Sequence, residues 1–127
     1  MKARLSIVIV LATAFLTVTS PLFAHHGTAA YDTGKQVTVK GTVTDFEFVN
    51  PHVMIVVNVL NDDGTTQRWQ GELTSPNHLA RAGWTKSSLQ PMQQVTITGF
   101  QGKNGNSIWI QKIVLADGRE LPLGTGD

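Results

Sequence analysis

Two adjacent histidines near the start of the chain, His25 and His26, are the residues whose type and position point most directly to chemistry. They follow a segment with the features of a secretory signal peptide, and cleavage after Ala24 creates a free amine on His25. An amine together with imidazoles suits Cu(II), with Zn(II) and Ni(II) as alternatives. The sequence therefore predicts a metal site, most plausibly for copper, at the N-terminus of the processed chain.

Two arrangements of this site fit the sequence. In the first, the amine and ring of His25 chelate the metal and His52 completes a T-shaped histidine brace. In the second, the amine of His25 combines with the backbone nitrogen and ring of His26 in a local chelate that needs no fold. His78, in the first turn of a predicted helix, is a further candidate ligand. The alternative interpretation is a solvated tail at residues 25 and 26 and ordinary turn chemistry at His52.

Two polar residues are candidates to orient these imidazoles, by hydrogen-bonding the ring nitrogen that does not bind the metal. Glu72 lies at the end of a predicted strand, and Asn50 stands two residues before His52. The alternatives are an exposed carboxylate at a strand end and an amide that caps a turn. Tyr31 and Asp32 either pack the N-terminal arm onto the domain or form a plain turn.

The first 24 residues are expected to be absent from the mature protein. Lys2 and Arg4 precede an apolar run over residues 7–16, which is shorter than the ~20 residues of a transmembrane helix. No cysteine follows this run, so a lipoprotein anchor is not expected. We therefore expect a periplasmic or secreted protein without stable membrane insertion. Its predicted parts are an N-terminal arm (25–34), one domain (35–121) and a flexible tail (122–127).

Charge and cysteine content narrow the function classes. Without the leader, eight basic side chains face nine acidic ones, so the sequence lacks the basic excess of a phosphate-backbone binder. We therefore expect no nucleic-acid partner. The chain has no cysteine, which excludes disulfides and thiolate metal sites. Any metal must be held by imidazole, amine, carboxylate, amide oxygen or thioether.

The hydrophobic pattern of the mature chain is mostly that of β-strands. Residues 36–45 alternate, and the apolar positions change parity at Phe46 and Phe48, which indicates a β-bulge near Asp45. Further strands are predicted over residues 53–60, 66–73, 94–100 and 107–115. A hairpin turn at residues 61–64 joins the second and third strands, and a loop over residues 101–106 joins the last two.

One short helix is predicted between the third and fourth strands. Ser75 is a suitable N-cap, Pro76 suits the first helical position, and Gly83 suits the left-handed stop. Three strands, a helix and two strands are the element order of a five-stranded OB-like barrel. An all-β domain of this kind is the preferred fold class, with an open β-sheet or small sandwich as the alternative. The tryptophans are expected in the core or between helix and barrel: Trp69, Trp84 and Trp109.

Several short motifs, taken in order along the chain, resemble a family of small exported bacterial proteins of unknown function. The most specific are the His25-His26-Gly27 start and the Asn50-Pro51-His52 turn. They are accompanied by Tyr31-Asp32, Gly41-Thr42-Val43, Ser75-Pro76-Asn77 and Arg81-Ala82-Gly83-Trp84. The resemblance extends over residues 25–121 and implies an exported, β-rich domain. It names no activity, and it marks His25, His26 and His52 as the family's polar signature.

The function predicted from these observations is copper capture, delivery or tolerance by a small exported protein. The alternative is an OB-like binding or interaction module whose ligand is a protein, a sugar or an envelope component. An enzyme is not expected, because nucleophile, metalloprotease and phosphate-loop motifs are absent from the sequence. Oxidative chemistry at a copper histidine brace is the single enzymatic option.

Overall fold

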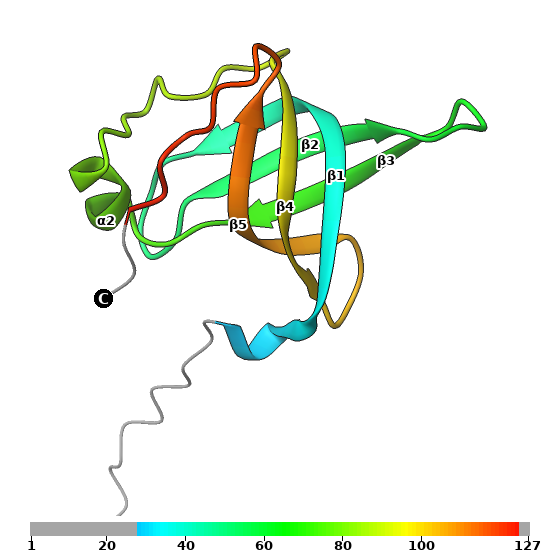
Figure 1. Ribbon diagram of the computed structural model, residues 1–127, viewed down its shortest axis with the longest axis horizontal. Helices are drawn as coiled ribbons and strands as arrows, with labels where there is room; N and C mark the ends of the chain where they lie inside the picture. Colours follow the sequence, from blue (N-terminus) through cyan, green and yellow to red (C-terminus); the bar gives the residue numbers. More distant parts are fainter. Residues whose placement is uncertain (1–27, 125–127) are drawn as a thin grey trace, which may run out of the picture.

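The protein is described here by a computed structural model covering residues 28–124, in which five strands close into a barrel (Figure 1). The strand order around the barrel is β1-β2-β3-β5-β4. A single 3-10 turn, η1, precedes β1, and one short helix, α2, lies between β3 and β4. The elements are η1 (Thr28–Ala30), β1 (Tyr31–Glu47), β2 (Met54–Leu60), β3 (Thr66–Glu72), α2 (Pro76–Arg81), β4 (Gln94–Gly102) and β5 (Ser107–Leu115).

The first strand bends so that it serves two neighbours. Its N-terminal part pairs with β4 and its C-terminal part pairs with β2, both antiparallel. The register with β2 shifts between Val43 and Asp45, which confirms the predicted bulge. A bulge increases local twist and curvature, and this allows a single long strand to follow the wall of a small barrel.

The barrel closes through a short parallel contact. Strand β3 pairs with β5 over only three residues, from Gln70 to Glu72, and β3 then ends as the chain turns toward α2. Beyond this contact the same edge of β5 is met by the C-terminal tail, where the backbone N–H of Leu121 donates to the carbonyl of Ile113. Between these two contacts, β5 is left with a stretch that neither β3 nor the tail covers.

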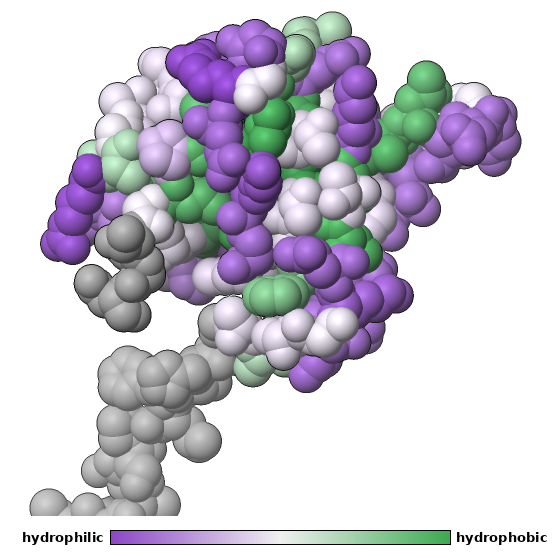
Figure 2. All heavy atoms as spheres, viewed as in Figure 1, coloured by the Kyte–Doolittle hydropathy of each residue, from purple (hydrophilic) through white to green (hydrophobic). Residues whose placement is uncertain are grey.

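The hydrophobic core fills the barrel and continues under α2. Alternate residues of β4 and β5 point inward, as their burial pattern shows. Figure 2 shows that polar and neutral residues cover most of this face, with patches of hydrophobic side chains visible among them. The side chains that are almost completely buried are Val43, Val53, Ile55, Val57, Leu73, Leu79, Leu89, Val95, Ile97, Ile108 and Ile113.

The helix has both of the ends predicted from the sequence. The Ser75 hydroxyl accepts from the backbone N–H of His78, and Pro76 occupies the first turn. Gly83 follows the helix with a φ of 95°, a left-handed value that residues with a Cβ rarely adopt. Leu79 is fully buried, so this one-and-a-half-turn helix is held by packing against the end of the barrel.

Two boundaries differ from the sequence prediction. β1 begins at Tyr31, so residues 31–34 belong to a strand and not to the predicted arm. The polar residues and the glycine that follow Tyr31 give no strand pattern in the sequence. The strand starts here because Tyr31 and Asp32 pair with β4. The tail is also docked in part, because the indole N–H of Trp84 donates to the carbonyl of Pro122 at 2.6 Å. Residues 1–27 and 125–127 lie outside the described part of the chain.

Candidate functional site

A carboxylate at the end of β3 connects two residues that are far apart in the sequence. One oxygen of Glu72, Oε1, is hydrogen-bonded to Nδ1 of His52, and the other, Oε2, accepts from the hydroxyl of Tyr31. The side chain of Glu72 is 18% exposed and that of His52 is 30% exposed. The cluster is therefore partly shielded from water but still open on the side of the imidazole.

The hydrogen-bond partners determine where the protons lie. Burial, followed by the hydrogen bond to Glu72 and the negative charge of that carboxylate, raises the pKa of Tyr31 above its ordinary value. The phenol is therefore the donor, and a carboxylate can only accept. In the neutral form of His52, the proton consequently resides on Nδ1 and points at Glu72. The other ring nitrogen, Nε2, keeps its lone pair, which is the state in which imidazole binds a metal.

The indole of Trp109 supports this cluster from the side. The ring centroids of His52 and Trp109 are 5.6 Å apart with an interplanar angle of 81°. The Tyr31 ring lies 5.8 Å from the same indole at 56°. Aromatic rings prefer such tilted and edge-to-face contacts, so Trp109 limits the rotation of both partners. Trp109 is only partly buried, so of the two predicted positions, in the core or between helix and barrel, it does not take the first.

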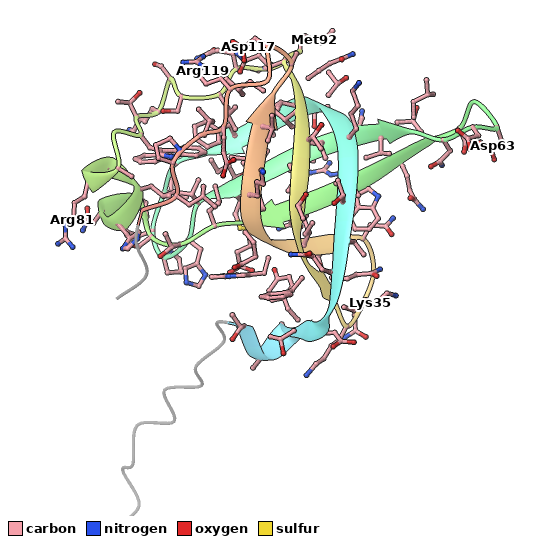
Figure 3. All side chains as sticks on the ribbon, viewed as in Figure 1. Lys35, Asp63, Arg81, Met92, Asp117 and Arg119 are labelled. Atoms are coloured by element: carbon pink, nitrogen blue, oxygen red, sulfur yellow. The ribbon has the colours of Figure 1, made fainter. Side chains whose placement is uncertain are left out.

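Sheet pairing explains why these residues meet. Met54 pairs with Glu72, and Glu72 pairs with Trp109, so the start of β2, the end of β3 and the start of β5 lie in one row. His52 precedes β2 by two residues and therefore reaches the same place. Tyr31, the first residue of β1, arrives from the opposite direction. In Figure 3, Lys35 marks the end of the barrel at which β1 begins, while Asp63 lies at the far tip of the β2–β3 hairpin.

The remaining candidate residues take different positions. His78 lies on α2 and lines a separate groove, to which Trp109 also contributes. Asn50 is exposed, is joined to Pro51 by a cis peptide bond, and takes no part in the hydrogen bonds of Glu72. His25 and His26 lie outside the described residues. Within residues 28–124, no three His, Cys, Asp or Glu side chains come together in a group that could hold a metal.

Sequence reasoning singled out His52 and Glu72 but treated them separately from Trp109. The signal that places Trp109 was present, because it stands between Ile108 and Ile110 in a strand whose alternate residues point inward. Period-two alternation puts the residue between them on the outer surface. No comparable local signal joins Tyr31 to Glu72, since that contact depends on how distant strands pair.

The barrel order, the parallel closure of β3 on β5 and the helix before β4 define the chain as an OB-fold protein. The chain belongs to a family of unknown function (DUF6152), whose model matches residues 13–111. This agrees with the resemblance noted from the sequence motifs. None of the curated proteins matches the chain in sequence.

Solved structures similar to this one include single-stranded DNA-binding proteins. The mitochondrial single-stranded DNA-binding protein Rim1 from S. cerevisiae aligns with a TM-score of 0.50 and 12% identity, over 65% of this chain and 93% of Rim1. A small single-stranded DNA-binding protein from Streptomyces coelicolor gives a TM-score of 0.45 and 16% identity, over 67% of this chain and 94% of that protein. At such identities the Rim1 alignment establishes the fold alone.

Across residues 28–124, no helix is long and apolar enough to cross a membrane.

Proposed function

We propose that this protein is an exported copper-binding protein in which His52 and the processed N-terminus share one Cu(II) ion. Its role would be capture, delivery or tolerance of the metal in the periplasm or outside the cell. The observation that carries the proposal is the hydrogen bond between Nδ1 of His52 and Glu72, which in the neutral imidazole leaves the lone pair on Nε2. A carboxylate behind an imidazole is the arrangement that orients metal-binding histidines in many proteins.

Tyr31 supports the second half of the proposal, because it brings the N-terminal part of the chain to His52. Its hydroxyl and the His52 ring are bound to the two oxygens of one carboxylate. Three peptide units separate His25 from Thr28, where η1 begins, which corresponds to a span of at most ~11 Å. In the proposed brace, this segment carries the amine and ring of His25 to Nε2 of His52 without any change in the barrel.

The proposal includes cleavage after Ala24, since only cleavage supplies the amine. An α-amino group has a pKa of about 7.7–8.0, so a metal can displace its proton near neutral pH. The amine, the His25 ring and the His52 ring form the proposed brace. In the local chelate, the metal is held by the amine of His25 and by the backbone nitrogen and ring of His26. His52 then makes no contribution to affinity. The experiment below separates these arrangements.

The test is a competition titration of Cu(II) against a chromophoric chelator, using protein that starts at His25. Adding one residue before His25 removes the α-amine from its ligand position, and we expect a large loss of affinity. His52→Ala removes a ligand, so it should weaken binding at least ten-fold. Glu72→Gln keeps the shape but loses the carboxylate behind the imidazole, for which a loss of about 10–100-fold is typical.

His78→Ala is the matched control, because this variant also deletes one imidazole, but one that lines the separate groove and is not among the hydrogen-bond partners of Glu72. We expect it to bind Cu(II) as the parent does. Equal affinity of the His52→Ala and His78→Ala proteins would refute the brace and leave the local chelate. Equal affinity with and without the extra N-terminal residue would refute both metal arrangements.

Single-stranded DNA binding, the activity in the name of the yeast neighbour, is not our proposal for this chain. The near balance of eight basic and nine acidic residues after residue 24 gives no excess of positive charge for a phosphate backbone. The alternative that we retain is an OB-like binding module without metal. It becomes the preferred function if neither metal arrangement survives the titration.

A further inference from the structure

A groove of about 450 Å³ lies on the outside of the barrel, and it adjoins the cluster of Tyr31, His52 and Glu72 at Trp109. Its volume falls within the range of small-molecule sites, about 300–1,000 Å³. Trp109 contributes to both places, since it contacts His52 and also lines the groove. The groove is lined by Leu73, Thr74, His78, Trp109, Ile110, Gln111, Leu123 and Gly124.

The groove exists because part of the edge of β5 is uncovered. Strand β3 leaves β5 after the Glu72–Trp109 pair, and the tail joins β5 at Ile113. Between these points lies Gln111, the extra residue of a bulge, because Thr98 pairs with Lys112 and Gly99 with Ile110. Gln111 is exposed, and its amide makes only a long contact of 3.4 Å to the adjacent carbonyl of Ile110.

The lining describes the chemistry of the ligand. Trp109 and Leu123 offer apolar surface over the buried Leu73 and Ile110, while Thr74, His78 and Gln111 offer a hydroxyl, an imidazole and an amide. In the described part of the chain, no Asp, Glu, Lys or Arg contributes to this lining. A neutral molecule with one apolar face and a rim of hydroxyls matches both the apolar and the polar part of this lining. Its C–H groups pack on the indole, and its hydroxyls form hydrogen bonds with the polar side chains.

The ends of the groove distinguish a compact ligand from an extended one. A peptide that adds to a strand edge must enter and leave along the strand. Here β3 closes one end at Trp109, and the tail closes the other end at Ile113. Only a compact ligand fits between these two contacts.

We propose that this groove binds a neutral pyranose unit, either as a free sugar or as the end of a glycan, with Trp109 as the stacking surface. Gln111 and His78 are its hydrogen-bonding residues. The two proposed sites share Trp109, but none of the polar groups of the groove belongs to the Tyr31, His52 and Glu72 cluster. This sugar site is a binding function in addition to copper binding, and it lies at the uncovered edge of β5.

The test is a titration of metal-free protein, starting at His25, with cellobiose and with N,N′-diacetylchitobiose, followed by two-dimensional ¹H–¹⁵N NMR. The indole N–H of Trp109, assigned through Trp109→Phe, and the side-chain amide of Gln111 should both shift with at least one sugar. Gln111→Ala removes one hydrogen bond, and we expect it to weaken binding about five- to ten-fold. Gln36→Ala, at an exposed position on β1, is the matched control and should bind as the parent does.

Soluble hydroxyethyl cellulose distinguishes the two sources of the sugar. Competition in proportion to the number of chain ends indicates a glycan terminus, whereas binding of the disaccharide without competition indicates free sugars. Absence of shifts at Trp109 and Gln111 with both disaccharides would overturn the proposal. Equal weakening by Gln111→Ala and Gln36→Ala would also overturn it, as would tighter binding of a neutral tripeptide or of phenol. Because no metal is added, failure here leaves the copper proposal unaffected.

Discussion

Replacing Tyr31 with phenylalanine removes one hydroxyl from the centre of the site and leaves its ring against Trp109. The deleted group donates to a carboxylate, and hydrogen bonds to charged groups contribute about 1.5–3 kcal/mol. Glu72 is 18% exposed, so water replaces part of the lost bond and the lower end of this range applies. We expect the free energy of unfolding to fall by about 1.5 kcal/mol. For a domain of this size, that change lowers the Tm by about 6–12 °C.

The same hydroxyl gives the protein a pH dependence of stability. Burial, the hydrogen bond to Glu72 and the charge of that carboxylate raise the pKa of Tyr31 in the folded state above the unfolded value of about 10. Between these two pKa values the unfolded chain has lost the phenolic proton and the folded chain has not. The contribution of Tyr31 is therefore complete below pH ~10 and is lost as the pH rises further, at up to about 1.4 kcal/mol per pH unit.

The assay uses the fact that Tyr31 is the only tyrosine of the chain. Near-ultraviolet absorbance of tyrosinate then reports this one group, and urea unfolding at a series of pH values reports its effect on stability. The parent should ionise only at a pH well above the ordinary tyrosine range, and its stability should fall above pH ~10 more steeply than that of Tyr31→Phe. An ordinary tyrosine titration, or equal stability of the two proteins at neutral pH, would refute the hydrogen-bonded cluster.

Further predictions concern the elements that hold the site. In Gly99→Ala, the new Cβ would lie 2.0 Å from the carbonyl oxygen of Trp109, so the β4–β5 bulge must open; we expect a loss of about 3 kcal/mol or more in urea unfolding. Gly34→Ala is its control, because the nearest atom there is an exposed Asp32 oxygen at 3.3 Å, and a change below about 1 kcal/mol is expected. Comparable losses for both glycines would show that the close approach at Gly99 is not the cause. Ser75→Ala removes the cap of α2 and should cost about 1 kcal/mol in thermal unfolding followed by circular dichroism, whereas no change would mean that the cap is dispensable.

Much of the fold was readable because its signals are local. The change of parity at Phe46 and Phe48 marked the bulge in β1, and Ser75, Pro76 and Gly83 marked the two ends of α2. The element order then selected the OB-like barrel over a sandwich. The start of β1 was missed because residues 32–35 are polar or glycine, and because Tyr31 and Asp32 pair with β4 across a register shift that ends at Gln36.

The site was readable in part for the same reason. The types of His52 and Glu72 suggested an imidazole with a carboxylate behind it, and the structure places the two side chains in contact. Their contact with Tyr31 and Trp109 depends on closure of β3 on β5 and on where β1 begins, which are relations between residues up to 78 positions apart. Local periodicity contains no information about such pairings. The groove beside Trp109 was not predicted, because it depends on where β3 leaves β5 and where the C-terminal tail joins β5.

Pulsed electron paramagnetic resonance of the Cu(II)-loaded protein that starts at His25 tests the central claim most directly. This measurement detects the remote nitrogen of each imidazole bound to the copper and therefore counts the bound rings. The proposed brace predicts two imidazoles in the parent and one in His52→Ala, with His78→Ala unchanged from the parent. A spectrum that is the same in the parent and in His52→Ala would contradict the claim that the barrel supplies a copper ligand.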